Sequence, residues 1–167
     1  MYRSLLVPLD GSATSARGLR DAIALARPLG ARITVLHVLD VYPFFGHAGW
    51  SGELELQLAP RREVANDLLA SAALDVQEAQ VPVSTVLKES LDAHAGAEIV
   101  RQARELGCDL IVMGTHGRRG LSRMLVGSDA LVVLRDSTIP VLLVGPPGKA
   151  PSMDGGVKTP RGDVPAA

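Results

Sequence analysis

The residues best suited to chemistry in this sequence lie between positions 113 and 128, in the stretch MGTHGRRGLSRMLVGS. It contains Gly114, Gly117 and Gly127, and Ser128 follows the last of them. Glycine lets backbone N–H groups approach a ligand closely, and the first turn of a helix offers N–H donors at the positive end of a dipole. The Ser128 hydroxyl adds a further donor. Together these groups suit the binding of a phosphate.

The spacing of these residues distinguishes the segment from the two commonest phosphate-binding loops. It runs G-x2-G-x9-G-S, whereas the Walker form requires G-x4-G-K-[ST] and the dinucleotide form requires G-x-G-x-x-G directly after the first strand. The simpler alternative is that Gly114 and Gly117 only shape a loop and that Ser128 only caps a helix. The place of the motif between a buried strand and a helix favours phosphate binding.

The elements that must position this segment are short apolar runs that alternate with amphipathic helices. Strands are expected at 4–9, 31–41, 81–89, 108–114 and 139–145. Helices are expected after Ser12, Pro60 and Asp92 and over 129–137, with inward faces at Leu19, Ile23 and Ala26, at Val64, Leu68, Ala72 and Val76, and at Ile99, Ala103 and Leu106. The alternation predicts a doubly wound parallel α/β sheet with a ligand crevice at the carboxyl ends of its strands.

The composition is typical of one such domain. Hydrophobic residues make up 47% of the 167 residues and aromatic residues only 3%, so the core must consist of aliphatic side chains. A formal net charge of −1 excludes a general attraction to nucleic acid or anionic lipid. The single cysteine and the lack of a signal-like or membrane-spanning run favour a cytoplasmic protein. Residues 1–145 are predicted to form the domain, and 146–167 a flexible tail rich in Pro and Gly.

Several stretches together resemble the universal stress protein family, in its ATP-binding type. They are LLVPLDGS, ITVLHV, DLIVMGTHGRRGL and PVLLV, with the G-x2-G-x9-G-[ST] motif, and the resemblance covers about residues 1–145. It implies a Rossmann-like five-stranded parallel sheet in the order 3-2-1-4-5, with helices on both faces. It also implies a homodimer that binds ATP or ADP across the crevice. We expect Mg²⁺ with the nucleotide, and contact between subunits through the fifth-strand edge.

The same resemblance implies roles for individual residues. Asp10 would lie near the adenine and ribose with Pro8 and Leu9 beside it, Val38 would line the adenine, and Met113 would flank the nucleoside. The phosphates and ribose would be held by Gly114, Gly117, Gly127 and Ser128, and His116 would contact a phosphate.

Asp129 departs from the family's pattern, in which many ATP-binding members carry an apolar or hydroxyl residue at that place. A carboxylate suits the first turn of a helix, but beside a triphosphate it has two alternative effects. It would repel the phosphates, or it would help to hold Mg²⁺. The histidines share no metal-ligand spacing, so no zinc site is expected. His37 and Cys108 are interpreted as core residues.

Three functions are compatible with these observations. The preferred one is a nucleotide-binding regulatory protein in which ATP occupancy changes the surface that a partner meets. The second is slow ATP hydrolysis or self-phosphorylation, for which Asp10 and Asp129 are the local carboxylates. The third is a nucleotide-free dimeric interaction module. The aromatic stretch 42–50 is interpreted either as a flap over the nucleotide or as a cluster packed on the second helix.

Overall fold

The computed structural model describes residues 1–41, 52–91, 95–115 and 126–146. Within these ranges strands and helices alternate as the sequence predicts. Their order is β1 (Ser4–Pro8), α1 (Ala13–Leu29), β2 (Arg32–Asp40), α3 (Gly52–Glu78), β3 (Val83–Ser90), α4 (Ala95–Glu105), β4 (Leu110–Gly114), α5 (Ser128–Asp136) and β5 (Val141–Val144). The aromatic stretch 42–50 and most of the predicted tail lie outside the described residues.

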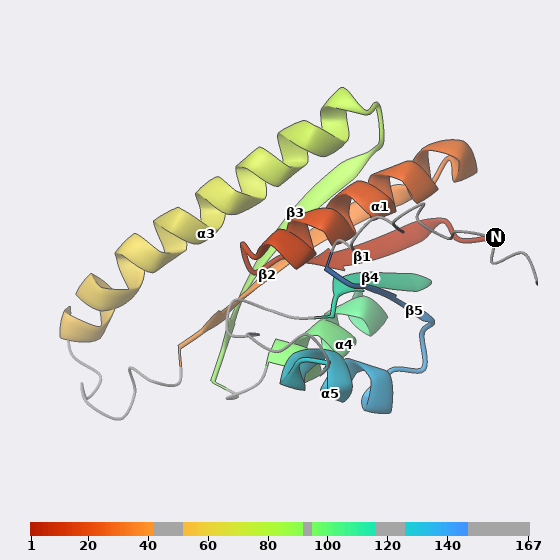
Figure 1. Ribbon diagram of the computed structural model, residues 1–167. Helices are drawn as coiled ribbons and strands as arrows, with labels where there is room; N and C mark the ends of the chain where they lie inside the picture. The colour runs from red at the N-terminus through yellow and green to blue at the C-terminus, as the bar shows by residue number, and fades with distance from the viewer. Residues whose placement is uncertain (42–51, 92–94, 116–125, 147–167) are drawn as a thin grey trace, which may run out of the picture.

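The five strands form one parallel sheet in the order β3-β2-β1-β4-β5. β1 lies in the middle, with Val7 opposite Val35 of β2 and Leu5 opposite Leu110 of β4. α1 and α3 cover one face, and α4 and α5 cover the other (Figure 1). The predicted doubly wound sheet and its strand order 3-2-1-4-5 are therefore confirmed.

Alternation along the strands divides the core into two layers. Leu5 and Val7 of β1 pack with residues of α1 and α3, whereas Leu6 packs with residues of α4 and α5. Because successive side chains of a strand point to opposite faces, a run of apolar residues serves both layers. Small residues of α1 are fully buried, including Ala22 and Ala26, so this helix lies close to the sheet.

The second helix differs from the prediction at its start and on its inner face. α3 begins at Gly52 and continues through Pro60, after which the helix is predicted to begin. Leu58, before this proline, is 3% exposed, whereas the predicted core residue Val64 is 68% exposed. A helix has 3.6 residues per turn, so residues spaced four apart move gradually around its surface and do not stay on one face. The buried stripe instead includes Ala65, with Leu58, Leu69, Ala72 and Val76.

A smaller correction concerns the end of α4. Ile99 and Ala103 are buried as predicted, but Leu106 is 36% exposed. It follows the last helical residue, Glu105, and Gly107 turns the chain with a φ of +62°. Leu106 therefore lies in the turn and not on the inner face of the helix.

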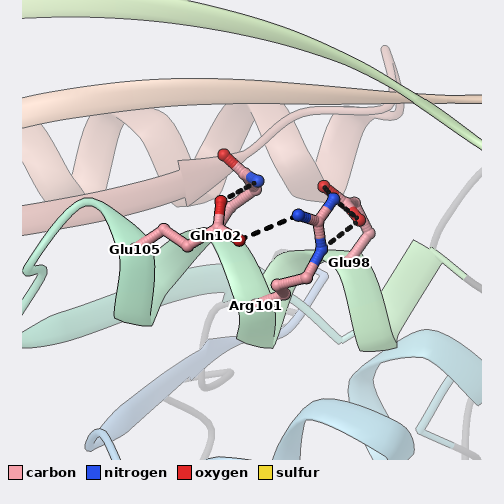
Figure 2. A network of polar contacts seen from close by, with 4 residues as sticks. All are labelled: Glu98, Arg101, Gln102 and Glu105. Carbon is pink, nitrogen blue, oxygen red and sulfur yellow. Dashed lines mark hydrogen bonds and ion pairs between the residues drawn. The ribbon is translucent and has the colours of Figure 1, made fainter.

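A network of charged and polar side chains runs along α4. Figure 2 shows Arg101 between Glu98 and Glu105, with Gln102 bonded to Glu105. The Arg101 guanidinium donates to both oxygens of Glu98, and to Glu105 at 2.8 Å. Glu98 lies in the first turn of the helix, where a carboxylate interacts favourably with the helix dipole. The network connects the first turn of α4 to its last.

Among the described residues, no helix combines the length and the apolar character needed to cross a membrane.

Candidate functional site

The order in which strands are added to the sheet reverses between β1 and β4. These strands are hydrogen-bonded neighbours, but the chain leaves β1 for α1 on one face and leaves β4 for α5 on the other (Figure 1). Loops that diverge in this way leave a crevice outside the carboxyl ends of the strands, where open α/β sheets bind ligands. Predicted site residues that follow both strands lie at these carboxyl ends.

The turn after β1 holds Asp10 in a defined position. Pro8 is the last residue of β1, as expected for a residue without an N–H group. The Leu9 N–H donates to the Leu36 carbonyl at 2.8 Å. The Asp10 carboxylate accepts a hydrogen bond from the Ser12 N–H at 3.0 Å, which is an Asx turn. Asp10 is therefore fixed at the entrance to α1.

Ser15 connects this turn to the end of β4. Its hydroxyl donates to the Ser12 carbonyl at 2.9 Å, and the Ser15 hydroxyl oxygen accepts a hydrogen bond from the Asp10 N–H at 3.5 Å. On the other side, a Cβ added to Gly114 would lie 3.0 Å from the Ser15 nitrogen. The end of β4 therefore contacts the first turn of α1, and Asp10 and Gly114 adjoin the same residue.

The segment that follows β4 is closed at its base. The Thr115 N–H donates to the Val144 carbonyl of β5 at 2.9 Å, and the Gly127 N–H donates to the Thr115 carbonyl at 2.7 Å. The candidates His116 and Gly117 fall between these points and lie outside the described residues. Because the two ends of the segment meet, α5 begins beside the carboxyl end of β4.

The first turn of α5 has no side-chain cap. Gly127 is the N-cap residue, in an extended conformation with φ −63° and ψ 156°, and it makes no side-chain capping bond. Ser128 is the first helical residue and is exposed. The alternative in which Ser128 serves only as the N-cap is therefore wrong. Its hydroxyl and the first backbone N–H groups, which have no partners within the helix, face the same end of α5.

Asp129 turns toward another helix. Its Oδ1 accepts a hydrogen bond from the backbone N–H of Gly96, in the first turn of α4, at 3.2 Å. The side chain is half-buried. The carboxylate thus has a protein partner besides the two roles toward a triphosphate that the sequence suggests.

Burial separates the remaining candidates. The side chains of Leu9 and Met113 are 5% and 6% exposed and belong to opposite core layers. Pro8 and Val38 are half-buried, and Val38 packs against the layer that contains Met113.

The structure confirms that two residues, His37 and Cys108, belong to the core as predicted. His37 is 4% exposed, and its Nδ1–H donates to the Leu9 carbonyl at 2.7 Å, which fixes the tautomer of the ring. Cys108 is buried at the opposite end of β4, with the Ser4 hydroxyl 3.7 Å from its sulfur. Burial raises the pKa of the Cys108 thiol above its usual value.

Sequence reasoning missed three residues that organise the site. They are Ser15, Thr115 and Gly96. A serine three residues after the Ser12 cap was a weak signal for the first. The sequence carried no signal for the other two, because each acts through a tertiary contact.

Other features of the described residues lie away from this edge. Shallow hollows of about 500 and 510 Å³ lie beside α4, from Ala97 to Asp136 of α5, and along α3 between Glu55 and Glu63. Neither is lined by a candidate residue. The described part of the chain holds no group of three or more His, Cys, Asp and Glu side chains that could bind a metal ion.

Comparisons with known proteins agree with this geometry. The Universal stress protein family model matches residues 1–145. Universal stress protein MJ0531 of Methanocaldococcus jannaschii is 35% identical over 149 residues, which cover 89% of this chain and 85% of that protein. The structure of MJ0577 from the same organism superposes with a TM-score of 0.76 at 27% identity, over 89% of this chain and 99% of that one.

Two structures with lower identity share the fold and contain nucleotides. One is a universal stress protein in complex with cAMP, at 23% identity and a TM-score of 0.63, over 86% of this chain and 97% of that one. The other is the Archaeoglobus fulgidus protein in complex with dAMP, at 24% identity and a TM-score of 0.61, over 86% and 98%. On the match of its family model and its curated relatives, the chain belongs to the universal stress protein family.

Proposed function

We propose that this protein is a regulatory protein that binds an adenine nucleotide, ATP or ADP with Mg²⁺, at the carboxyl ends of β1 and β4. One observation carries the proposal. The uncapped first turn of α5 begins beside the end of β4, and β4 in turn ends against the Asp10 turn through Ser15. Hydrogen-bond donors suited to phosphate and a carboxylate suited to ribose thus lie together at the carboxyl ends of these two strands.

The nucleoside end of this site would be formed by the strands. The Asp10 carboxylate, oriented by its bond to Ser12, would accept hydrogen bonds from ribose hydroxyls. Pro8 and Val38, both half-buried, offer apolar surface for the adenine. The universal stress proteins that carry cAMP and dAMP share only the fold with this chain, so they support the class of ligand and not these contacts.

The phosphate end would be formed by the glycine segment. Gly127 and Ser128 would present backbone N–H groups and one hydroxyl, which are favourable partners for phosphate oxygens. Gly114, Gly117 and His116 would complete this end, with Mg²⁺ bound chiefly by the phosphates and water.

In the cytoplasm, a bound nucleotide would exert its effect by changing how this chain associates with a second copy of itself. Leu142 on the edge strand β5 is 40% exposed, and Leu131 and Leu134 of the neighbouring α5 are 55% and 46% exposed. An apolar sheet edge is suited to association. Since α5 contributes both to this surface and to the phosphate end, a bound nucleotide would favour one arrangement of the dimer.

The first test is to identify what the purified protein carries. The protein is prepared without added nucleotide and denatured, and any released small molecule is identified by chromatography and mass. Protein stripped of ligand is then titrated with ADP and with ATP, each with and without Mg²⁺, by calorimetry. Release of an adenine nucleotide, or saturable binding, supports the proposal. Absence of both at about millimolar nucleotide, the weak limit of useful affinity, refutes it and leaves a dimeric interaction module.

The enzymatic alternative requires its own measurement. Phosphate release from ATP is followed in the wild-type protein, in Asp10→Asn and in Asp129→Asn. Turnover that disappears in both variants while ADP binding persists would favour hydrolysis over regulation, because both carboxylates would then serve chemistry and not affinity.

A further inference from the structure

Asp129 links the starts of two helices that are far apart in the sequence. Its carboxylate belongs to the first turn of α5, and its Oδ1 accepts the Gly96 N–H of α4 at 3.2 Å. An N–H group in the first turn of a helix has no partner within its own helix. Asp129 therefore supplies a cap to α4 from a neighbouring element.

The backbones of the two helices meet at the same place. A Cβ added to Gly96 would lie 2.7 Å from the Asp129 carbonyl oxygen and 2.7 Å from the Val132 Cβ. Real Cβ atoms do not approach so closely, so only glycine permits this spacing. The hydrogen bond and the glycine contact together fix the start of α5 against α4.

On the side of α4, this junction is backed by core packing and by a network of ion pairs. The helix carries the Glu98–Arg101–Glu105 network one turn further on (Figure 2), and its inner residues Ile99 and Ala103 are buried in the core. The start of α5 is tied to the end of β4 by the Gly127 N–H, which donates to the Thr115 carbonyl at 2.7 Å. The hydrogen bond of Asp129 to Gly96 thus holds the turn that contains Gly127 and Ser128 in position against α4.

We infer that Asp129 is a positioning residue of the nucleotide site, which holds the first turn of α5 in place for phosphate through its hydrogen bond to Gly96. The inference rests on the proposed function and assigns to Asp129 neither a contact with phosphate nor one with Mg²⁺. It also separates two properties of the side chain. The acceptor oxygen maintains the helix junction, and the negative charge opposes an anionic ligand at the same helix end.

Two substitutions distinguish these properties. Asp129→Asn removes the charge and keeps an acceptor oxygen for Gly96, whereas Asp129→Ala removes both. Because both variants are neutral at this position, the difference between them reports the side-chain amide and its hydrogen bond without a change of charge. Each variant and the wild-type protein are titrated with ADP and with adenosine in the presence of a chelator, so that no divalent cation contributes.

We expect Asp129→Asn to bind ADP at least as tightly as the wild-type protein. Asp129→Ala should bind ADP about fivefold more weakly than Asp129→Asn, a coupling of ordinary size, while the adenosine affinities of the two agree within about twofold. A general loss of folding would weaken both ligands alike, so the ratio of ADP to adenosine affinity isolates the phosphate end. Equal ADP affinities in the two variants would overturn the inference.

Gly96→Ala gives an independent perturbation, since it keeps the carboxylate but pushes α4 away from α5. Gly145→Ala is the matched control, because a Cβ there meets no atom within 4 Å. Gly96→Ala should lower ADP affinity relative to adenosine as Asp129→Ala does, and an unchanged ratio would contradict the inference. If the wild-type protein binds neither ligand, the proposed function itself has failed; if it binds both and these variants do not differ, only the role of Asp129 has failed.

Discussion

Gly114 and Thr14 are in such close contact that a side chain at the glycine would collide with the threonine. A Cβ added to Gly114 would lie 3.1 Å from the Thr14 Cβ and 3.0 Å from the Thr14 carbonyl carbon. Thr14 belongs to the first turn of α1, and Gly114 ends β4. The first glycine of the predicted phosphate motif therefore has a packing role between a helix and the sheet, whatever it contributes to a ligand.

Gly114→Ala is expected to lower the free energy of unfolding by about 2 kcal/mol, as overpacking does in a well-packed core. Urea unfolding measures this directly. Gly145→Ala is again the control, since it adds a methyl group into open space at the end of β5, and it should change stability by less than about 0.5 kcal/mol. Equal stability of the two variants would show that α1 yields at Thr14 without cost. A loss of nucleotide affinity in Gly114→Ala would not by itself identify a phosphate contact.

Two serines at helix starts should behave differently on substitution. The Ser12 hydroxyl accepts the Ser15 N–H at 3.1 Å and caps α1, so Ser12→Ala should cost about 1 kcal/mol of stability. Ser128 is exposed and lies after the N-cap of α5, so Ser128→Ala should leave stability unchanged. If the hydroxyl binds phosphate, Ser128→Ala will weaken ADP binding about tenfold, the usual value of a hydrogen bond to a charged group.

Urea unfolding and ADP calorimetry of both variants provide the check. A Ser128→Ala protein that is stable and binds ADP like the wild-type protein would remove the hydroxyl from the phosphate site. A Ser12→Ala protein of unchanged stability would mean that another group replaces the cap.

The order of elements could be predicted because each strand is a short apolar run and each helix has a buried stripe. The start of α3 could not, because Pro60 predicts that the helix begins after it, whereas α3 begins at Gly52. Proline disfavours a helix interior by removing an N–H donor, but here the helix extends to Gly52 and Leu58 is buried against Leu39 and Val41. Tertiary packing outweighed the local preference.

The candidate site was located by spacing, but its internal contacts were not. The sequence placed Gly114 and Gly127 after a strand and before a helix, and both lie there. Nothing local to Asp129 indicated a bond to Gly96, which is 33 residues away. Links of this kind depend on how two helices meet on the face of a sheet, and only the fold determines that distance.

The exposed leucines of α5 and β5 provide a prediction about association. Leu142→Glu places a charge on the edge strand and should shift a dimer toward monomer, because a desolvated, unpaired carboxylate is strongly unfavourable in an interface. Leu74→Glu on α3 is the control, since Leu74 is 60% exposed on a helix at the other face of the sheet. Sedimentation analysis of both variants at several concentrations measures the effect. A dimer unaffected by Leu142→Glu would exclude the fifth-strand edge as its interface.

Cys108 should make stability depend on pH in the alkaline range. Burial, the largest cause, raises the pKa of its thiol in the folded state above the usual value near 9. The folded protein therefore holds the thiol proton more tightly than the unfolded chain does. The stabilisation is fully present below about pH 9 and is lost as the pH rises through the folded value.

Urea unfolding of the wild-type protein and of Cys108→Ala at about pH 7, 9 and 10, on either side of the usual thiol value, tests this directly. The alanine variant carries the same lysines and tyrosines, so the difference between the two free energies of unfolding isolates the thiol. We expect this difference to be constant at pH values below the usual pKa of a thiol and to shrink above it. The reason is that the wild-type protein loses the contribution of its protonated thiol, which the alanine variant lacks at every pH. A difference that does not change with pH would mean that the thiol titrates alike in the folded and unfolded chains, and that Cys108 opens to solvent more readily than its burial beside Ser4 indicates.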